Sequence, residues 1–445
     1  MPALLRIAML ATFWVTIILI PFRLRLLTLP RPRPPIYFDF TDFILFASDL
    51  MMLATLILWA FHLALNTGRF TLGSFFLTIP LAGITLVGLL SVLFSIDIGL
   101  SFYHLIRLIL LFGFYLFVVN ELRDLSLIIT PVAIQISIQA IAGITQILDQ
   151  QSIGLTLLGE LDLDPSWNGI SIVWAEGIRS LRAYGLTDHP NILGGCLAFG
   201  LILLISHFLT TEKDRTLLTA AFILGALGLF YTFSRSAWLA FGIGVIVVSI
   251  WLFRLRKYQE FRALLALTTA SLIAMTPFIW HNLPYVGVRF NHQHSFTQNA
   301  HENQAIGERV ILNQIANEIF LTQPLTGVGV GAFPVALNLQ RPNYPYNHQP
   351  AHVVLLNIAA ETGVLGGLFY IILITFPWLA VWLNRHRLDF TPYFIGACAL
   401  LLATTVVGFF DYYTWFLAPG RLWQWLAMGV WGAVYHRSLQ EGNHA

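Results

Sequence analysis

Apolar stretches of about 20 residues recur along the whole chain, and no other feature limits the possible folds as strongly. A helix of that length spans the hydrocarbon core of a bilayer, and inside lipid it satisfies all of its own backbone hydrogen bonds. We therefore predict an all-α, polytopic membrane protein with about twelve transmembrane helices. The predicted spans are residues 4–22, 42–65, 72–94, 100–120, 125–148, 189–209, 216–233, 237–254, 262–281, 353–383, 392–410 and 421–436.

Composition supports a lipid-facing exterior. Of 445 residues, 57% are hydrophobic and only 10% are charged, whereas a soluble domain carries about 25% charged residues. The formal net charge is only +2, so we expect membrane lipids as partners and no nucleic acid.

The distribution of positive charge predicts which side of the membrane each loop occupies. Lys213, Arg215, Arg254, Arg256 and Lys257 gather in short connections on one side, the side expected to be cytoplasmic. With both termini on that side, the protein is expected in the cytoplasmic (inner) membrane, with N- and C-termini cytoplasmic. The first outer connection, which contains four arginines between residues 23 and 33, runs against this pattern for no reason visible in the sequence.

Two long hydrophilic segments, 149–188 and 282–352, would then both lie outside the cytoplasm. Long loops of this kind are usually functional. We divide the chain accordingly into N-terminal transmembrane helices, residues 1–148, and a functional region, residues 149–445, that holds both loops. Within the second loop, Val310, Ile311, Ile315 and Ile319 recur at helical spacing and predict a surface helix.

Several short polar motifs follow one another between residues 180 and 375. They are Arg182-Ala-Tyr-Gly185, His189-Pro-Asn191, Ser234-Arg235-Ser236, Arg309 on the loop helix, Pro324-Leu-Thr-Gly327-Val-Gly329-Val-Gly331, and His352 nine residues before Glu361-Thr-Gly363. Taken alone, the glycine-rich run indicates tight turns rather than a phosphate loop, because no strand precedes it.

In this order, the motifs resemble those of the O-antigen ligase and polymerase superfamily of membrane glycan ligases. The first five spans resemble that family only in being hydrophobic. The family usually has asparagine directly after the histidine, where this chain has Val353, so His348, which follows Asn347, is a second candidate for the family's histidine.

The resemblance implies a glycosyltransferase that works on the outer face of the cytoplasmic membrane. Its donor would be a glycan on undecaprenyl diphosphate, and its acceptor a sugar hydroxyl on a glycan or glycolipid, as in lipopolysaccharide biosynthesis. It also implies catalytic roles for His352, Arg235 and Arg182, and substrate binding by Arg309, Arg179, His348 and His189.

The same residue types suit that chemistry on physical grounds. Arginine forks bind phosphate oxygens in bidentate fashion and would stabilise a diphosphate leaving group without a metal. A neutral histidine can accept the proton of an acceptor hydroxyl. A metal site at His292, His294 and His301 is disfavoured because no cysteine or nearby aspartate accompanies them. We therefore expect no metal and no other cofactor.

Alternative interpretations remain for the residues and for the function. Arg179 and Arg182 would also suit headgroup-facing arginines, and Arg235 an ordinary loop charge. A polysaccharide polymerase of the same superfamily differs from a ligase only in its acceptor. A lipid-glycan flippase or transporter is the non-enzyme alternative, although such proteins tend to place ionisable groups at the membrane midplane.

Charged residues well inside the predicted spans are few, chiefly Asp49 and Arg107. Asp49 and Arg107 lie at a similar depth in spans of the same direction, so we predict that they form an ion pair. Glu361 lies nine residues after His352, which would place the two side chains on opposite faces of a continuous helix. We therefore expect Glu361 to be structural, as a cap near Gly363.

Overall fold

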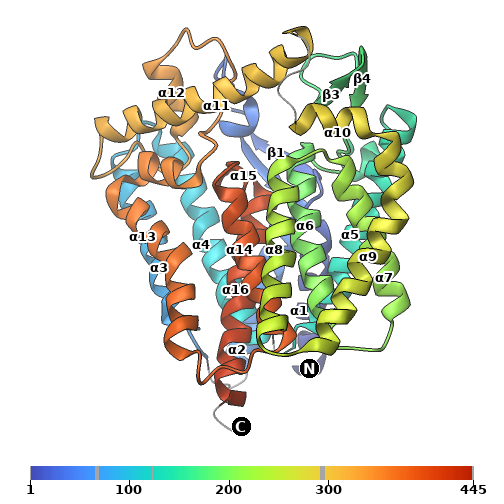
Figure 1. Ribbon diagram of the computed structural model, residues 1–445. Coiled ribbons are helices and arrows are strands. Elements are labelled where there is room, and N and C mark those ends of the chain that lie inside the picture. The colour runs from blue at the N-terminus through green and yellow to red at the C-terminus, as the bar shows by residue number, and fades with distance from the viewer. Residues whose placement is uncertain (1, 66–69, 123, 291–295, 443–445) are drawn as a thin grey trace.

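The computed structural model describes residues 2–65, 70–122, 124–290 and 296–442, including all their side chains except those of Pro2 and residues 296–306. The described chain is a bundle of long helices covered at one end by shorter helices and two hairpins (Figure 1). The helices of the bundle are α1 (Pro2–Leu19), α2 (Ala47–Leu65), α3 (Phe75–Leu93), α4 (Ile98–Glu121), α5 (Ser126–Asp149), α6 (Pro190–Phe208), α7 (Arg215–Tyr231), α8 (Arg235–Arg254), α9 (Tyr258–His281), α13 (Val354–Asn384), α14 (Pro392–Gly408) and α16 (Ala418–Gly442).

These helices confirm the prediction of a polytopic, all-α membrane protein, and each predicted span corresponds to one of them. Within the described residues, eight are long and apolar enough to cross a membrane, and the apolar parts of α1, α7 and α14 are somewhat shorter. The twelfth predicted span falls in α16, which also carries Arg421 and Gln424.

The centre of the bundle is formed by α6, α14 and α16, which pack against one another. In the most apolar 18-residue stretch of α6, 89% of the residues are buried. In the corresponding stretches of α8 and α9 only 28% and 22% are buried, as expected for helices that face lipid. Small residues let the central helices approach closely. A Cβ atom on Gly195 of α6 would collide with Tyr413, so this glycine allows α15 (Tyr413–Phe416) to sit directly on the helix.

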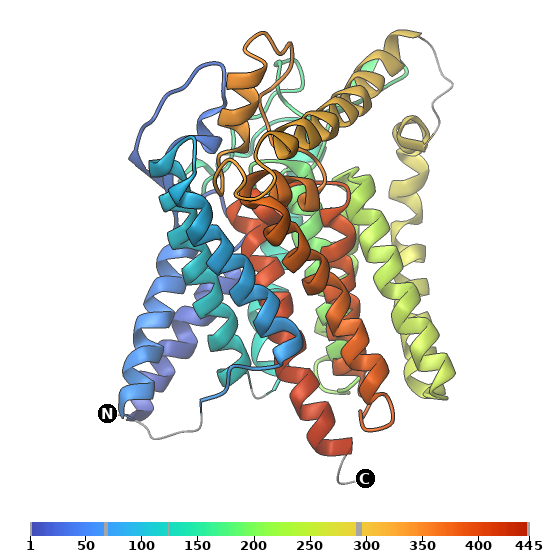
Figure 2. The ribbon, with the colours of Figure 1, turned by 90° about the vertical axis from the view of Figure 1, so that its left-hand side faces the viewer.

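The end of the bundle opposite both termini carries the remaining elements (Figures 1 and 2). These are the hairpin β1 (Arg25–Leu29)–β2 (Phe43–Phe46), the hairpin β3 (Ile172–Ala175)–β4 (Ile178–Leu181), the 3-10 turns η1 (Phe38–Phe40) and η2 (Thr156–Leu158), and the helices α10 (Leu283–Phe290), α11 (Phe296–Thr322), α12 (Phe333–Gln340) and α15. Both predicted outer loops therefore lie at one end of the molecule, although neither is wholly irregular.

The first hairpin corrects one predicted boundary. The apolar run from residue 42 is not helical throughout, because Phe43–Phe46 pairs antiparallel with Arg25–Leu29, and α2 begins only at Ala47. An apolar run of four residues has no periodicity that distinguishes a strand from the first turn of a helix.

The arginines of the first connection, unexplained by the sequence, lie in ion pairs. The pairs are Arg23–Asp188 at 2.5 Å, Arg25–Asp39 at 2.8 Å, Arg25–Asp188 at 3.4 Å, Arg31–Asp97 at 2.9 Å and Arg33–Asp97 at 2.8 Å. Burial raises the pKa of Asp39 to about 6, with neighbouring Asp188 adding to the rise and Arg25 opposing it. Each of the four arginines therefore has an aspartate partner at the same end of the bundle.

A break in α13 organises the glycine-rich loop. Gly363 has φ 75° and ψ −172°, which interrupts the helix, and Val364 N donates to Pro324 O at 2.8 Å. Glu361 is fully buried and accepts hydrogen bonds from Trp415 Nε1 at 2.9 Å and from Phe333 N at 3.3 Å. The carboxylate therefore contacts the start of α12, which corrects the predicted cap near Gly363.

Helix α11 lies across the top of the bundle (Figure 2) and confirms the predicted surface helix, with a different apolar face. Ile315 and Ile319 are buried together with Leu312, whereas Val310 and Ile311 are exposed. The helix packs on α13, and this contact rotates its buried face toward Leu312.

The predicted intramembrane ion pair is present. Asp49 Oδ2 accepts from Arg107 Nη2, and both side chains are nearly buried. Arg107 Nη1 also donates to the carbonyl of Ile44 at 3.0 Å and to the Tyr103 hydroxyl, and Asp49 accepts from Phe46 N at 3.1 Å. The pair thereby fixes β2 to α4.

Candidate functional site

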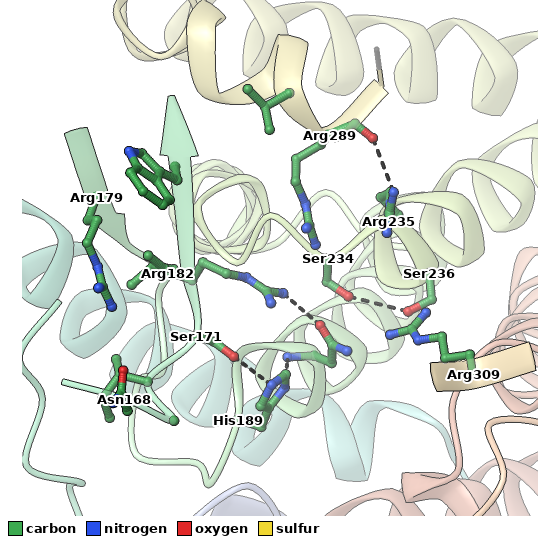
Figure 3. A pocket seen from close by; sticks show the side chains of 16 residues that line it. Asn168, Ser171, Arg179, Arg182, His189, Ser234, Arg235, Ser236, Arg289 and Arg309 are labelled. Carbon is green, nitrogen blue, oxygen red and sulfur yellow. Dashed lines mark hydrogen bonds between the residues drawn. The ribbon is translucent and has the colours of Figure 1, made fainter. Parts of the chain in front are cut away.

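A cavity of about 410 Å³ opens beneath α10 and α11, at the end of the bundle opposite the termini (Figure 3). It lies between β3–β4, the start of α6, the α7–α8 turn, α10 and α11. Five arginines line it: Arg179, Arg182, Arg235, Arg289 and Arg309. No carboxylate is among the described residues of the lining, so the cavity suits an anion.

The α7–α8 turn holds two of these guanidinium groups. Arg182 Nε donates to the carbonyl of Thr232 at 2.7 Å, and Arg289 donates to the carbonyl of Phe233 through Nε at 3.0 Å and Nη2 at 2.8 Å. Phe233 has a positive φ of 47°, a left-handed conformation that non-glycine residues adopt only where surrounding structure imposes it. The turn thus directs consecutive carbonyls to two arginines that are 5% and 8% exposed.

The other three arginines are more accessible. Arg235 is the first residue of α8 and donates from Nη1 to the carbonyl of Arg289 at 3.4 Å. Arg309 extends from α11, and its guanidinium lies beside Ser236 (Figure 3). Arg179, on β4, is exposed and reaches the carbonyl of Trp167 at 3.5 Å. Four elements therefore contribute cations to one space.

His189 caps α6 and is held by both ring nitrogens. Its Nδ1 accepts from Asn191 N at 3.1 Å, which leaves Nε2 as the protonated nitrogen facing Ser171 Oγ at 2.7 Å. Burial, with Arg182 as the next cause, lowers the pKa of His189 well below its usual range. A neutral imidazole with both nitrogens engaged positions its neighbours rather than accepting a proton.

A second cavity, of about 340 Å³, adjoins the first. The two share Gly169, Ser171, His189, Asn191 and Arg309. The second cavity also contains His352, Asp411 and Tyr412. The arginine-lined cavity therefore lies directly beside a cavity that contains His352 and Asp411.

His352 is a buried imidazole close to a carboxylate. Its Nδ1 lies 3.9 Å from Asp411 Oδ1, and its ring contacts Tyr412 with centroids 5.1 Å apart. Burial lowers the pKa of His352 to about 4, against the raising effect of Asp411. The imidazole is therefore neutral near pH 7 and has a carboxylate beside it to stabilise the protonated form.

Asp411 is itself fixed, by the amide of Asn191. Asn191 Nδ2 donates to Asp411 Oδ2 at 2.9 Å, and Asn191 Oδ1 accepts from Arg182 Nη2 at 2.6 Å. Tyr412 N donates to Asp411 Oδ1 at 2.9 Å. One side chain thus connects an arginine of the first cavity to the carboxylate of the second.

His348 occupies a different environment. It is buried against Tyr344, with ring centroids 5.5 Å apart, and does not line the second cavity, although its neighbours Asn347 and Gln349 do. Burial lowers the pKa of His348. Of the two candidate histidines, only His352 lines the second cavity.

Gln349 connects α11 to the segment after α14. Its Nε2 donates to Glu308 Oε1 at 2.8 Å, and its Oε1 accepts from the Tyr412 hydroxyl at 3.1 Å. Burial raises the pKa of Glu308. These bonds hold the helix that carries Arg309 next to the ring that contacts His352.

The structure brings together most of the residues singled out from the sequence. Arg179, Arg182, Arg235, Arg309 and His189 line the first cavity, and His189, Arg309 and His352 line the second. Arg182 is buried in hydrogen bonds, which contradicts the interpretation of it as a headgroup-facing arginine. His292 and His294 lie outside the described residues, as does the side chain of His301.

Sequence reasoning missed two residues of the site. Arg289 lies in α10, which we had not predicted, and Asp411 is the first residue after a predicted span. A carboxylate standing alone between two apolar spans was a usable signal for Asp411. No comparable signal marked Arg289. Its guanidinium is held by the carbonyl of Phe233, which lies 56 residues earlier in the chain.

Residues 220–371 match the family model described as O-antigen ligase. The matched segment runs from α7 to the first half of α13 and includes Arg235, Arg309 and His352. Over this segment the match bears out the resemblance drawn from the motifs. No curated protein matches the chain.

Proposed function

We propose, from the O-antigen ligase domain in residues 220–371, that this membrane protein transfers a glycan from undecaprenyl diphosphate to the hydroxyl of an acceptor sugar. One observation carries the proposal: the five-arginine cavity shares five lining residues with the cavity of His352 and Asp411. We assign the reaction to residues 149–445, with the helices of residues 1–148 as their membrane support.

The arginine-lined cavity suits the diphosphate of the donor. A diphosphate offers several anionic oxygens, and guanidinium forks bind such oxygens in bidentate pairs. Arg235 and Arg309, the more accessible members, would contact the phosphates directly, whereas Arg182 and Arg289 are already held by backbone carbonyls. Fixed cations at this position stabilise the charge that develops on the leaving group, without a metal.

His352 would act as the general base. The acceptor hydroxyl gives its proton to His352 while its oxygen forms a bond to the anomeric carbon of the donor glycan. The bond from that carbon to the diphosphate oxygen breaks, and undecaprenyl diphosphate leaves with the bonding electrons. Asp411, 3.9 Å from His352 Nδ1, stabilises the resulting imidazolium.

The two substrates would meet at the residues that the cavities share. Arg309 and Asn191 border both spaces, so a glycan whose diphosphate lies among the arginines would direct its anomeric carbon toward His352. Positioning of this kind is itself a large part of catalysis by bond-transfer enzymes.

We place the site on the extracytoplasmic face of the inner membrane. Both cavities lie at the end of the bundle opposite the termini, and the short connections at the terminal end carry the excess of lysine and arginine. The lipid-linked donor would reach this end from the surrounding leaflet.

Reconstitution tests the function. The purified chain, placed in vesicles with an undecaprenyl-diphosphate glycan, should release undecaprenyl diphosphate only when an acceptor is present. Transfer to a lipid A core acceptor identifies a ligase, and lengthening of the donor glycan identifies a polymerase. Movement of the lipid-linked glycan across the bilayer without any transfer would instead identify a flippase and refute the proposal.

A further inference from the structure

A third cavity, of about 190 Å³, lies between α2, α4 and α16. Its lining includes Asp49, Arg107 and Arg421, and the remaining residues are apolar except Tyr103. It shares no lining residue with the two cavities of the candidate site. Charged groups at such a depth in a membrane protein usually mark a functional site.

Among the described residues, Arg421 forms no direct ion pair with a carboxylate. It is 5% exposed, and it donates to the carbonyl of Phe416 and contacts His104 Nδ1 at 3.3 Å, both neutral groups. Its Nε has no hydrogen-bond partner among the described residues, and no ion pair there includes it. Glu361 attracts Arg421 electrostatically but does not line the cavity, and its carboxylate accepts hydrogen bonds from Trp415 and Phe333.

The charges in this cavity therefore sum to a net positive value. Asp49 already balances Arg107 through a direct hydrogen bond, so the charge of Arg421 remains. A buried cation without a counter-ion is costly, and an anion supplied from outside the chain would remove that cost.

The cavity lining has charged residues toward the end that carries the candidate site and apolar residues farther from it, as a phospholipid has a charged headgroup and apolar acyl chains. Helices α2, α4 and α16 all begin at the end of the bundle that carries the candidate site and run away from it (Figure 1). Asp49 and Arg421 are within the first turn of their helices, whereas Met52, Leu110 and Leu111 lie deeper. Ile106, also in the lining, is 44% exposed, so the cavity borders the surrounding lipid.

We propose that this cavity binds an anionic phospholipid, with its phosphate between Arg107 and Arg421 and an acyl chain along Met52, Leu110 and Leu111. The phosphate would supply the counter-ion that Arg421 lacks. The bound lipid would fill the space between α2 and α4 beside α16, the helix that follows the Asp411–Tyr412 segment. The inference is independent of the proposed reaction, because it concerns other residues and is tested by binding.

Native mass spectrometry of the delipidated full chain tests this site. Phosphatidylglycerol should bind as one retained molecule, phosphatidylcholine with the same chains should bind more weakly, and inorganic phosphate alone should not bind. Arg421→Gln should weaken phosphatidylglycerol binding by about tenfold or more, since a hydrogen-bonded charge is lost. Arg341→Gln is the matched control, because Arg341 is an exposed arginine at the C-terminal end of α12. This variant should bind phosphatidylglycerol as tightly as the unaltered protein.

A second variant keeps the test decisive if Arg421→Gln does not fold. Leu110→Trp narrows the apolar part of the cavity and leaves all three charges in place, so it should also lose the retained lipid. Undiminished phosphatidylglycerol binding by a folded Arg421→Gln or Leu110→Trp protein would overturn the inference. Equal binding of inorganic phosphate would overturn the assignment of the ligand as a lipid.

Discussion

The Asp49–Arg107 pair allows the sharpest test of what holds the bundle together. The two side chains are 10% and 12% exposed and hydrogen-bond directly, at a depth where neither finds bulk water. Removing one partner of a buried ion pair costs about 3–5 kcal/mol, because the other charge is left uncompensated. Asp49→Asn and Arg107→Leu should therefore each lower the free energy of unfolding by about 3 kcal/mol.

The double variant should be far less unstable than the sum of the two. Once both charges are gone, the remaining loss is that of the hydrogen bonds from Arg107 to Ile44 and Tyr103, about 1–2 kcal/mol in total. The coupling free energy should therefore be about 4–5 kcal/mol.

Unfolding should be measured in nanodiscs of zwitterionic lipid, so that no anionic lipid contributes. The ion pair Arg341–Glu318, at 2.9 Å and about half exposed on both sides, is the control, with an expected coupling below about 1 kcal/mol. Additive effects at Asp49 and Arg107, or a coupling no larger than that of the exposed pair, would refute the reasoning.

Four further predictions concern the site and its orientation. His352→Ala should lower glycan transfer by about 10²–10⁴-fold in a steady-state assay while donor binding persists, and His348→Ala should be much milder; the reverse result would move the base to His348. Arg235→Lys should lower transfer at least about tenfold with folding unchanged, because lysine keeps the charge but not the fork; activity retained in Arg235→Ala would exclude a diphosphate clamp there. Because burial holds the pKa of His352 at about 4, kcat/KM should stay flat down to about pH 5.5, where a histidine of ordinary pKa would already have lost about tenfold. Asp411→Asn removes the group that raises this pKa, so the acidic limb should move to still lower pH as kcat falls. A cysteine substituted at Asn343 should react with an impermeant reagent in intact cells, and labelling only after lysis would invert the topology.

The membrane architecture could be predicted from the sequence because its cause is local. Each span satisfies its own backbone and exposes apolar side chains, so twenty consecutive residues contain most of the information. The ion pair of Asp49 and Arg107 was predictable for a similar reason, since charges in lipid have few ways to be neutralised.

The parts that could not be predicted depend on contacts between distant residues. Residues 43–46 become a strand only because residues 25–29 pair with them. Glu361 was expected near Gly363, but its carboxylate meets Phe333 and Trp415, which a helical repeat cannot reveal. At the site, the motifs identified Arg182, Arg235 and His352 separately, whereas the roles of Arg289 and Asp411 become visible only when α10 and the end of α14 are placed beside them.

The amide of Asn191 has a consequence for how opposite charges coexist at this site. Its carbonyl end can face only a donor and its amino end only an acceptor, so it sits between Arg182 and Asp411 in a single orientation. Without such a spacer, a guanidinium and a carboxylate this close would collapse into a direct ion pair and neutralise each other. The neutral amide connects the two groups through hydrogen bonds and neutralises neither. An aspartate at this position would repel Asp411, and a lysine would repel Arg182, so this one uncharged side chain maintains two fields of opposite sign within a few ångströms.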